Sequence, residues 1–159
     1  MTVATDDTPI TAITATVRAA ITAVDDPEMP GVSIVDLGLL ESLEVRANGA
    51  VTVGLIPTFS GCPALAVISE AVRAAVAAVD GVKEVQVDFL RSPSWSIERV
   101  TPRAERALAQ RLGVAVERDG AATCPRCGAA TTERSLFGPT RCRAVHVCTG
   151  CGEAVEVMR

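Results

Sequence analysis

Residues 50–81, AVTVGLIPTFSGCPALAVISEAVRAAVAAVDG, contain a strand, a loop and a helix in direct succession. Apolar side chains alternate from Val51 to Leu55, which predicts a strand with one buried face. From Leu65 to Val79 they recur every three or four positions, which predicts an amphipathic helix. The Asp-Gly pair that closes the stretch ends this helix, because glycine adopts the conformation needed after a helix C-terminus.

The sequence on both sides of this stretch predicts further elements. Apolar residues at helical spacing predict a first helix, and an Asn48-Gly49 pair between two alternating segments predicts a β-hairpin. Alternation after the central helix predicts a third strand, and Thr101-Pro102 is typical of a helix start. These elements cover residues 10–24, 39–45, 85–89 and 102–112. The order αββαβα predicts an α/β fold, a small open sandwich with a mixed sheet, in which the strand after the central helix runs parallel to the strand before it.

The C-terminal segment carries two Cys-x-x-Cys-Gly motifs, CPRCG at 124–128 and CTGCG at 148–152. This repeat is typical of a zinc ribbon, in which each motif presents two thiolates from a tight turn. The predicted metal ligands are Cys124, Cys127, Cys148 and Cys151. Four thiolates complete a tetrahedral coordination sphere, so we expect a structural zinc ion. A rubredoxin-type iron remains the alternative, because it uses the same donor set.

Charge divides the chain at the same place as the cysteines. The formal net charge is −6 over residues 1–122 and +2 over residues 123–159. Residues 113–122 show no clear period and include a glycine-containing stretch, which indicates a connecting segment. We therefore predict a first domain at 1–113, a linker at 114–122 and a zinc ribbon at 123–159.

Composition excludes several classes of function. A net charge of −4, a pI near 5.0 and only four aromatic residues argue against binding to nucleic acid or to an anionic membrane. The chain begins with acidic residues and its first basic residue is Arg18, so we expect no secretory signal and a cytoplasmic location. No nucleophile and base pair, phosphate loop or flavin motif is visible, so we expect no catalytic site of its own.

Cys62 differs from the ribbon cysteines because it precedes the central helix. Unpaired N–H groups and the helix dipole at that position are expected to lower the pKa of its thiol. The alternative is a small buried apolar residue. Asp26 and Glu28, on a proline-fixed turn, are either turn residues or, together with Cys62, an oxygen and thiolate site for a transient metal ion.

Two residues of the ribbon stay outside the predicted ligand set. Cys142 lies six positions before Cys148, too far along an extended strand to share its metal, and we leave it as an unassigned thiol. His146 is expected to be a ring packed beside the site, and a fifth ligand is the alternative.

Three blocks of the first domain resemble the metal-sulfur cluster assembly factor family, which includes iron-sulfur cluster carrier and SufT-type maturation proteins. They are DPEMP at 26–30, SIVDLGL at 33–39 and PTFSGCPA at 57–64. SPSWSI at 92–97 and SLFGPTRCRA at 135–144 extend the likeness to the PaaD family of bacterial phenylacetyl-CoA epoxidase systems. The resemblance covers nearly the whole chain. It departs from the family where relatives usually carry Pro-Pro-Trp-Thr and where an aromatic residue usually lies near His146.

The resemblance implies an accessory role in aerobic phenylacetate catabolism, beside a di-iron oxygenase and a reductase that holds flavin and a [2Fe-2S] cluster. The reactive cysteine of the family corresponds to Cys62, and its acidic-proline motif corresponds to Asp26, Pro27 and Glu28. On this basis we expect a factor that helps load iron or an Fe-S cluster into the oxygenase, the reductase or another Fe-S client protein. The alternative is a structural subunit that bridges oxygenase and reductase without thiol chemistry.

Overall fold

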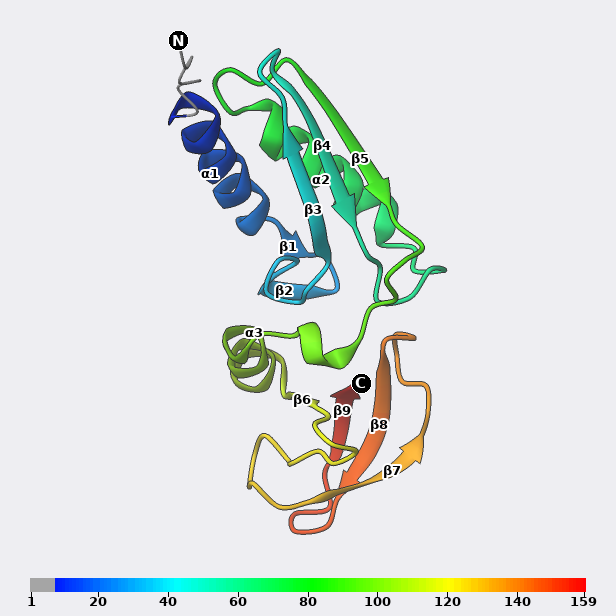
Figure 1. The fold of residues 1–159 in the computed structure, drawn as a ribbon. Coiled ribbons are helices and arrows are strands. Elements are labelled where there is room, and N and C mark those ends of the chain that lie inside the picture. The colour runs from blue at the N-terminus through cyan, green and yellow to red at the C-terminus, as the bar shows by residue number, and fades with distance from the viewer. Residues whose placement is uncertain (1–7) are drawn as a thin grey trace.

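The structure is a computed structural model and describes residues 8–159. The acidic residues 1–7, on which the expectation of no secretory signal partly rests, lie outside this range. Elements occur in two groups, one on each side of α3 (Figure 1). The helices are α1 (Thr8–Thr22), α2 (Leu65–Ala77), η1 (Ile97–Arg99), α3 (Pro102–Ala107) and η2 (Leu108–Leu112). The strands are β1 (Asp25–Asp26), β2 (Met29–Ser33), β3 (Leu40–Val45), β4 (Ala50–Leu55), β5 (Glu84–Phe89), β6 (Val114–Val116), β7 (Thr131–Ser135), β8 (Arg143–Cys148) and β9 (Ala154–Met158).

The first group forms an α/β sandwich around a three-stranded sheet of order β3-β4-β5. Strands β3 and β4 are antiparallel, whereas β4 and β5 are parallel and paired from Ala50 with Glu84 to Leu55 with Phe89. Helices α1 and α2 pack against the sheet and against each other (Figure 1). The predicted fold class, an open sandwich with a mixed sheet, is therefore confirmed.

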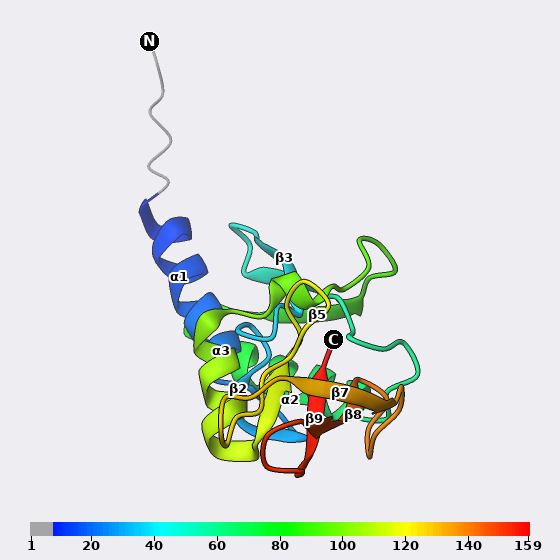
Figure 2. The same ribbon diagram turned by 90° about the horizontal axis from the view of Figure 1, so that it is seen from below.

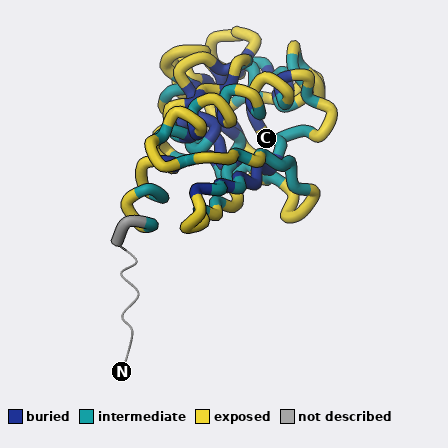
Figure 3. The backbone as a smooth tube through the Cα atoms, turned by 90° about the horizontal axis from the view of Figure 1, so that it is seen from above, coloured by how far each residue is buried: buried dark blue, intermediate teal, exposed yellow. Residues whose placement is uncertain are grey.

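Alternation along the strands separates the core from solvent. In β4 the side chains of Val51, Val53 and Leu55 are fully buried, and they contact Val72 and other apolar residues of the helices. The intervening positions face outward, as the two-residue period of a half-buried strand requires. Figure 3 shows the buried segments inside the molecule and the exposed ones along its outer loops and turns. Burial of one sheet face by two helices thus supplies the core of the first domain.

The Asn48-Gly49 pair closes the predicted hairpin between β3 and β4. Gly49 has a φ of 86°, a region that other residues rarely adopt, and its N–H donates to the carbonyl of Arg46. The Asn48 side-chain oxygen accepts a hydrogen bond from the N–H of Ala50 at 3.0 Å. The local sequence alone therefore accounts for this turn.

Residues 25–33 are more ordered than a turn that only ends a helix. Strands β1 and β2 form a small antiparallel pair between α1 and the sheet. Carboxylates complete it, because Asp26 accepts the N–H of Glu28 at 2.8 Å and Asp25 accepts the N–H of Gly31 at 2.9 Å. Side chains here supply bonds that the backbone of such a short ladder lacks.

The predicted linker at 114–122 contains strand β6, which the sequence pattern did not reveal. Strand β6 joins the ribbon in a four-stranded sheet of order β6-β9-β8-β7, where it runs parallel to β9. Its three residues are all buried, and three residues are too few to show a hydrophobic period. Arg118 follows it and donates to the carbonyls of Ile97 and Val100, both at 2.9 Å. The segment is thus fixed on both sides.

Strands β6 and β9 place alternate side chains in two different cores. Val114, Val116 and Met158 belong to the core of the first domain, whereas Ala115 and Val157 belong to a smaller apolar cluster of the ribbon. The ribbon consequently lies against one end of the sandwich (Figure 2). The division of the chain at residues 113 and 123 stays a prediction. Residues 8–159 contain no helix with the length and apolar character that crossing a bilayer requires.

Met158→Ala tests whether the two groups unfold together. Met158 is fully buried in the first domain although it belongs to the last strand of the ribbon. Its truncation should lower the free energy of unfolding of the whole chain by about 2–5 kcal/mol, from lost burial and a cavity. Urea titration followed by circular dichroism measures this, and Leu136→Ala, at a side chain 48% exposed, should change it by less than about 0.5 kcal/mol. Separate transitions, with the first domain unaffected by Met158→Ala, would contradict the shared core.

Candidate metal centre and thiol cleft

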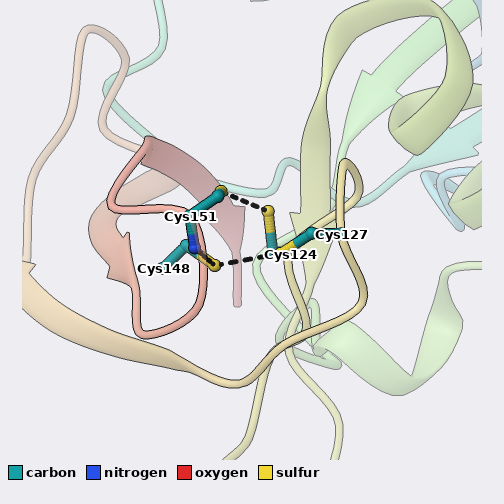
Figure 4. A group of neighbouring side chains, drawn as sticks. All are labelled: Cys124, Cys127, Cys148 and Cys151. Atoms are coloured by element: carbon teal, nitrogen blue, oxygen red, sulfur yellow. Dashed lines mark hydrogen bonds between the residues drawn. The ribbon is translucent and has the colours of Figure 1, made fainter.

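Four thiols of the ribbon converge at one point (Figure 4). The sulfur atoms of Cys124, Cys127, Cys148 and Cys151 all lie within 4.8 Å of one another. Cys124 Sγ is 3.9 Å from Cys151 Sγ, and Cys127 Sγ is 3.4 Å from Cys148 Sγ. A tetrahedral centre with metal–sulfur bonds of about 2.3 Å needs sulfur atoms about 3.8 Å apart. The donor set and its spacing therefore fit a closed metal–thiolate centre.

The two motifs fold into matching turns for the same local reason. Gly128 has a φ of 75° and Gly152 a φ of 76°, and each donates its N–H to the carbonyl of the first cysteine of its motif. A side chain at either glycine would be strained in this conformation. The expected role of the glycine after each cysteine pair is therefore confirmed.

Backbone donors prepare the second turn for a thiolate. The N–H groups of Cys151 and Gly150 donate to Cys148 Sγ at 3.4 and 3.3 Å. These hydrogen bonds, that of Cys151 being the stronger cause, lower the pKa of the Cys148 thiol to about 6. Hydrogen bonds to the charged form favour ionisation, so this sulfur is ready to bind a cation at neutral pH.

Cys142 and His146 lie outside this group of four, as expected. His146 is buried, and its Nδ1 lies 2.9 Å from the Thr131 hydroxyl oxygen. Cys142 precedes β8 at the far end of that strand, with its sulfur 3.3 Å from the Thr140 hydroxyl oxygen. Neither residue completes the centre.

A second candidate site is a cleft of about 230 Å³ between the first domain and the ribbon. The loop before α2 contributes Phe59 and Cys62, and the β1–β2 turn contributes Glu28. The loop between β7 and β8 closes the other side with Arg141 and Cys142. The Arg141 guanidinium lies over the Phe59 ring, 5.4 Å from its centroid, which is a cation–π contact between the two walls.

The expected lowering of the Cys62 pKa is wrong in direction. Helix α2 begins at Leu65, so Cys62 precedes the cap and does not occupy the first turn. Burial raises the pKa of the half-buried thiol, and the N–H of Ala64 opposes this effect, while the charges of Glu28, Asp26 and Cys142 raise it further. Cys62 is therefore mainly protonated until a cation or another favourable partner arrives.

Asp26 and Glu28 have different roles in the neighbouring turn. Asp26 is only 7% exposed and holds the turn through the N–H of Glu28, whereas Glu28 lines the cleft. Burial raises the pKa of Asp26, although the N–H of Glu28 lowers it and the charge of Arg143 on β8 does the same. The structure thus brings Asp26, Glu28 and Cys62 into one region, with Glu28 the better placed carboxylate. No sequence pattern indicated the contributions of Cys142 and Arg143.

The family described as "Iron-sulfur cluster assembly protein" matches residues 14–89, and the "PaaD zinc beta ribbon domain" matches residues 110–159. A protein of Escherichia coli (strain K12), assigned as a subunit of 1,2-phenylacetyl-CoA epoxidase, is 32% identical over 150 residues, which are 89% of each chain. The chain belongs to this PaaD family. The resemblance found in the sequence is thereby confirmed.

Other relatives match the first domain. An Fe-S protein maturation auxiliary factor of Porphyromonas gingivalis is 42% identical over 81 residues, which are 51% of this chain and 76% of the relative. Among solved structures, a domain of unknown function (DUF59) from Bacillus anthracis has a TM-score of 0.59 at 33% identity, covering 64% of this chain and 95% of its own. A conserved hypothetical protein from Thermotoga maritima has a TM-score of 0.52 at 28% identity, covering 58% and 89%. The sandwich is therefore shared with maturation factors, and the ribbon is an addition.

Glu28→Gln tests the electrostatic coupling across the cleft. Removal of the Glu28 charge removes one cause that raises the pKa of Cys62, so more thiolate forms and alkylation at pH 8 should be about twofold faster. Mass spectrometry after brief treatment of the metal-loaded protein with iodoacetamide measures the rate at Cys62. The matched control is Glu84→Gln on β5, an exposed carboxylate that should leave the rate unchanged. An unchanged or slower rate in Glu28→Gln would show that the carboxylate does not act on Cys62.

Proposed function

We propose that this protein is an accessory maturation factor of a phenylacetyl-CoA epoxidase system, which carries iron or an Fe-S cluster transiently at Cys62. The observation that carries the proposal is the joint position of Cys62 and Glu28, from separate loops, at one cleft. Family membership supports it, because relatives of the first domain are named as Fe-S maturation factors and a full-length relative as part of an epoxidase. The clients are the oxygenase and reductase subunits, or another Fe-S protein.

The chemistry of the cleft suits a cargo that must leave again. One thiolate and one carboxylate occupy few positions around an iron ion and leave the others open to exchange. Burial and like charges keep the Cys62 thiol protonated in the absence of cargo, and a cation reverses this balance. Thiol ligands must also stay reduced, so the cytoplasm remains the predicted location.

The ribbon centre has the opposite character, and we assign it a structural zinc ion. Four sulfur ligands leave no open position, so the ion holds the two turns together and does not activate substrate. Iron in a rubredoxin-type centre is the competing assignment. The ribbon segment has only a small apolar cluster of its own, so metal binding contributes directly to its folding.

Elemental analysis of the purified protein should find one zinc per chain. Cys148→Ala should abolish this zinc and the β-sheet signal of the ribbon, since three ligands cannot close the centre and the ribbon lacks a large core. Cys142→Ser is the matched cysteine control and should retain one zinc, because Cys142 lies outside the group of four. A red protein that contains iron and no zinc would instead identify a rubredoxin-type centre.

Cys62→Ser tests the maturation role in cells that lack their own copy of the gene. The variant should fold, keep one zinc and fail to support epoxidase activity or growth on phenylacetate, because serine is a poor ligand for iron. Ser60→Ala, an exposed neighbour on the same loop, should support normal growth. Normal growth with Cys62→Ser, together with stable co-purification with the oxygenase and reductase, would favour the bridging role without thiol chemistry.

A further inference from the structure

Cys142 faces the same cleft as Cys62 although the two residues belong to different domains. The wall opposite Cys62 consists of Pro139, Thr140, Arg141 and Cys142, from the loop between β7 and β8. Neither the four-thiol centre nor any hydrogen bond of the ribbon core uses the Cys142 sulfur. The cleft therefore offers two thiols and the Glu28 carboxylate to whatever enters it.

The loop that carries Cys142 is held in place from the ribbon side. Arg143, which is almost fully buried, forms an ion pair with Glu156 of β9 at 2.8 Å, and its Nε donates to the Thr140 hydroxyl at 2.9 Å. The N–H of Gly138 donates to the carbonyl of Arg143 at 2.7 Å, which closes the turn. Cys142 is thus presented by the ordered sheet of the ribbon.

Negative groups gather around this cleft without a matching positive one at its centre. After burial, the charges of Glu28, Asp26 and Cys142 all disfavour the Cys62 thiolate. The nearby cations are already paired, Arg143 with Glu156 and Arg141 with the Phe59 ring. A bound cation would turn each of these repulsions into an attraction, because all four groups become ligands or counter-charges.

We propose that Cys142 is a second thiolate ligand of the transient site, so that Cys62, Cys142 and Glu28 together bind a thiophilic divalent cation such as ferrous iron. This inference rests on the proposed function, to which it adds a ligand supplied by the ribbon. Both thiols release their protons to solvent when the cation binds. Among residues 8–159 only the four ribbon cysteines have three or more ligand atoms within 4.8 Å of each other, so the cleft closes around its cation.

The role of the ribbon follows from this arrangement. Its structural centre fixes the sheet, the sheet fixes the β7–β8 loop, and the loop supplies the second thiolate. Two thiolates and one carboxylate still leave coordination positions open, as a site that receives and releases metal requires.

Cobalt(II) is a suitable probe, because it binds thiolates less tightly than zinc and leaves the loaded ribbon centre intact. Zinc-loaded full-length protein is titrated with cobalt(II) without oxygen, and thiolate-to-cobalt charge-transfer absorption is recorded. The wild type should bind one cobalt with the intensity of two thiolates. Cys142→Ser and Cys142→Ala should each lose about half of that intensity and bind cobalt at least about tenfold more weakly. Thr132→Ala, at an exposed position on β7, is the matched control and should behave like the wild type.

A second measurement uses the unaltered protein, so that it does not depend on the folding of a variant. Dibromobimane, which becomes fluorescent when it alkylates two thiols, should join the peptides of Cys62 and Cys142, and bound cobalt should block this reaction. Wild-type cobalt affinity and intensity in Cys142→Ser, or no joined peptide in the wild type, would overturn the role of Cys142. If Cys62→Ser still abolishes growth on phenylacetate in that case, the proposed function stands and only the second ligand is lost. If Cys62→Ser grows normally while both probes succeed, the cleft binds metal but the maturation role fails.

Discussion

Strands β6 and β9 hold the ribbon to the first domain, and the position of every candidate ligand follows from this packing. Val114, Val116 and Met158 lie in the large core, while their neighbours along the same strands lie in the ribbon cluster. A strand whose two faces are buried in different cores cannot rotate without exposing one of them to water. The packing fixes the ribbon relative to the sandwich and, through β8, brings the β7–β8 loop to the loop that carries Cys62.

The chain thereby contains two thiol sites of opposite design. In the ribbon, four sulfur atoms at tetrahedral spacing and backbone donors to Cys148 form a centre with no open position. At the cleft, ligand groups come from three separate loops, and they stand apart until a cation draws them together. A closed site keeps its ion and stabilises the fold, whereas a divided and incomplete site can exchange its ion with a client protein.

The Cys62 thiol shows how tertiary contacts can reverse a local effect. A position before a helix favours the thiolate, and the N–H of Ala64 does lower the pKa of Cys62. Burial and three neighbouring negative groups outweigh it, so the net direction is upward. The same neighbours favour a bound cation, and a thiol that is protonated without cargo is also less exposed to oxidation.

The elements of the sandwich, the Asn48-Gly49 turn and the four ligands of the ribbon could all be predicted from the sequence, because periodicity, turn chemistry and Cys-x-x-Cys-Gly spacing are local properties. Resemblance to a family also pointed to Cys62, Asp26 and Glu28. Strand β6 could not be predicted, since its three residues form a strand only because β9 lies beside them. Nor could the position of Cys142 across a cleft from Cys62, 80 positions away in the chain. That juxtaposition and the raised pKa of Cys62 exist only in the folded chain, because both arise from burial and charges that the fold assembles from distant segments.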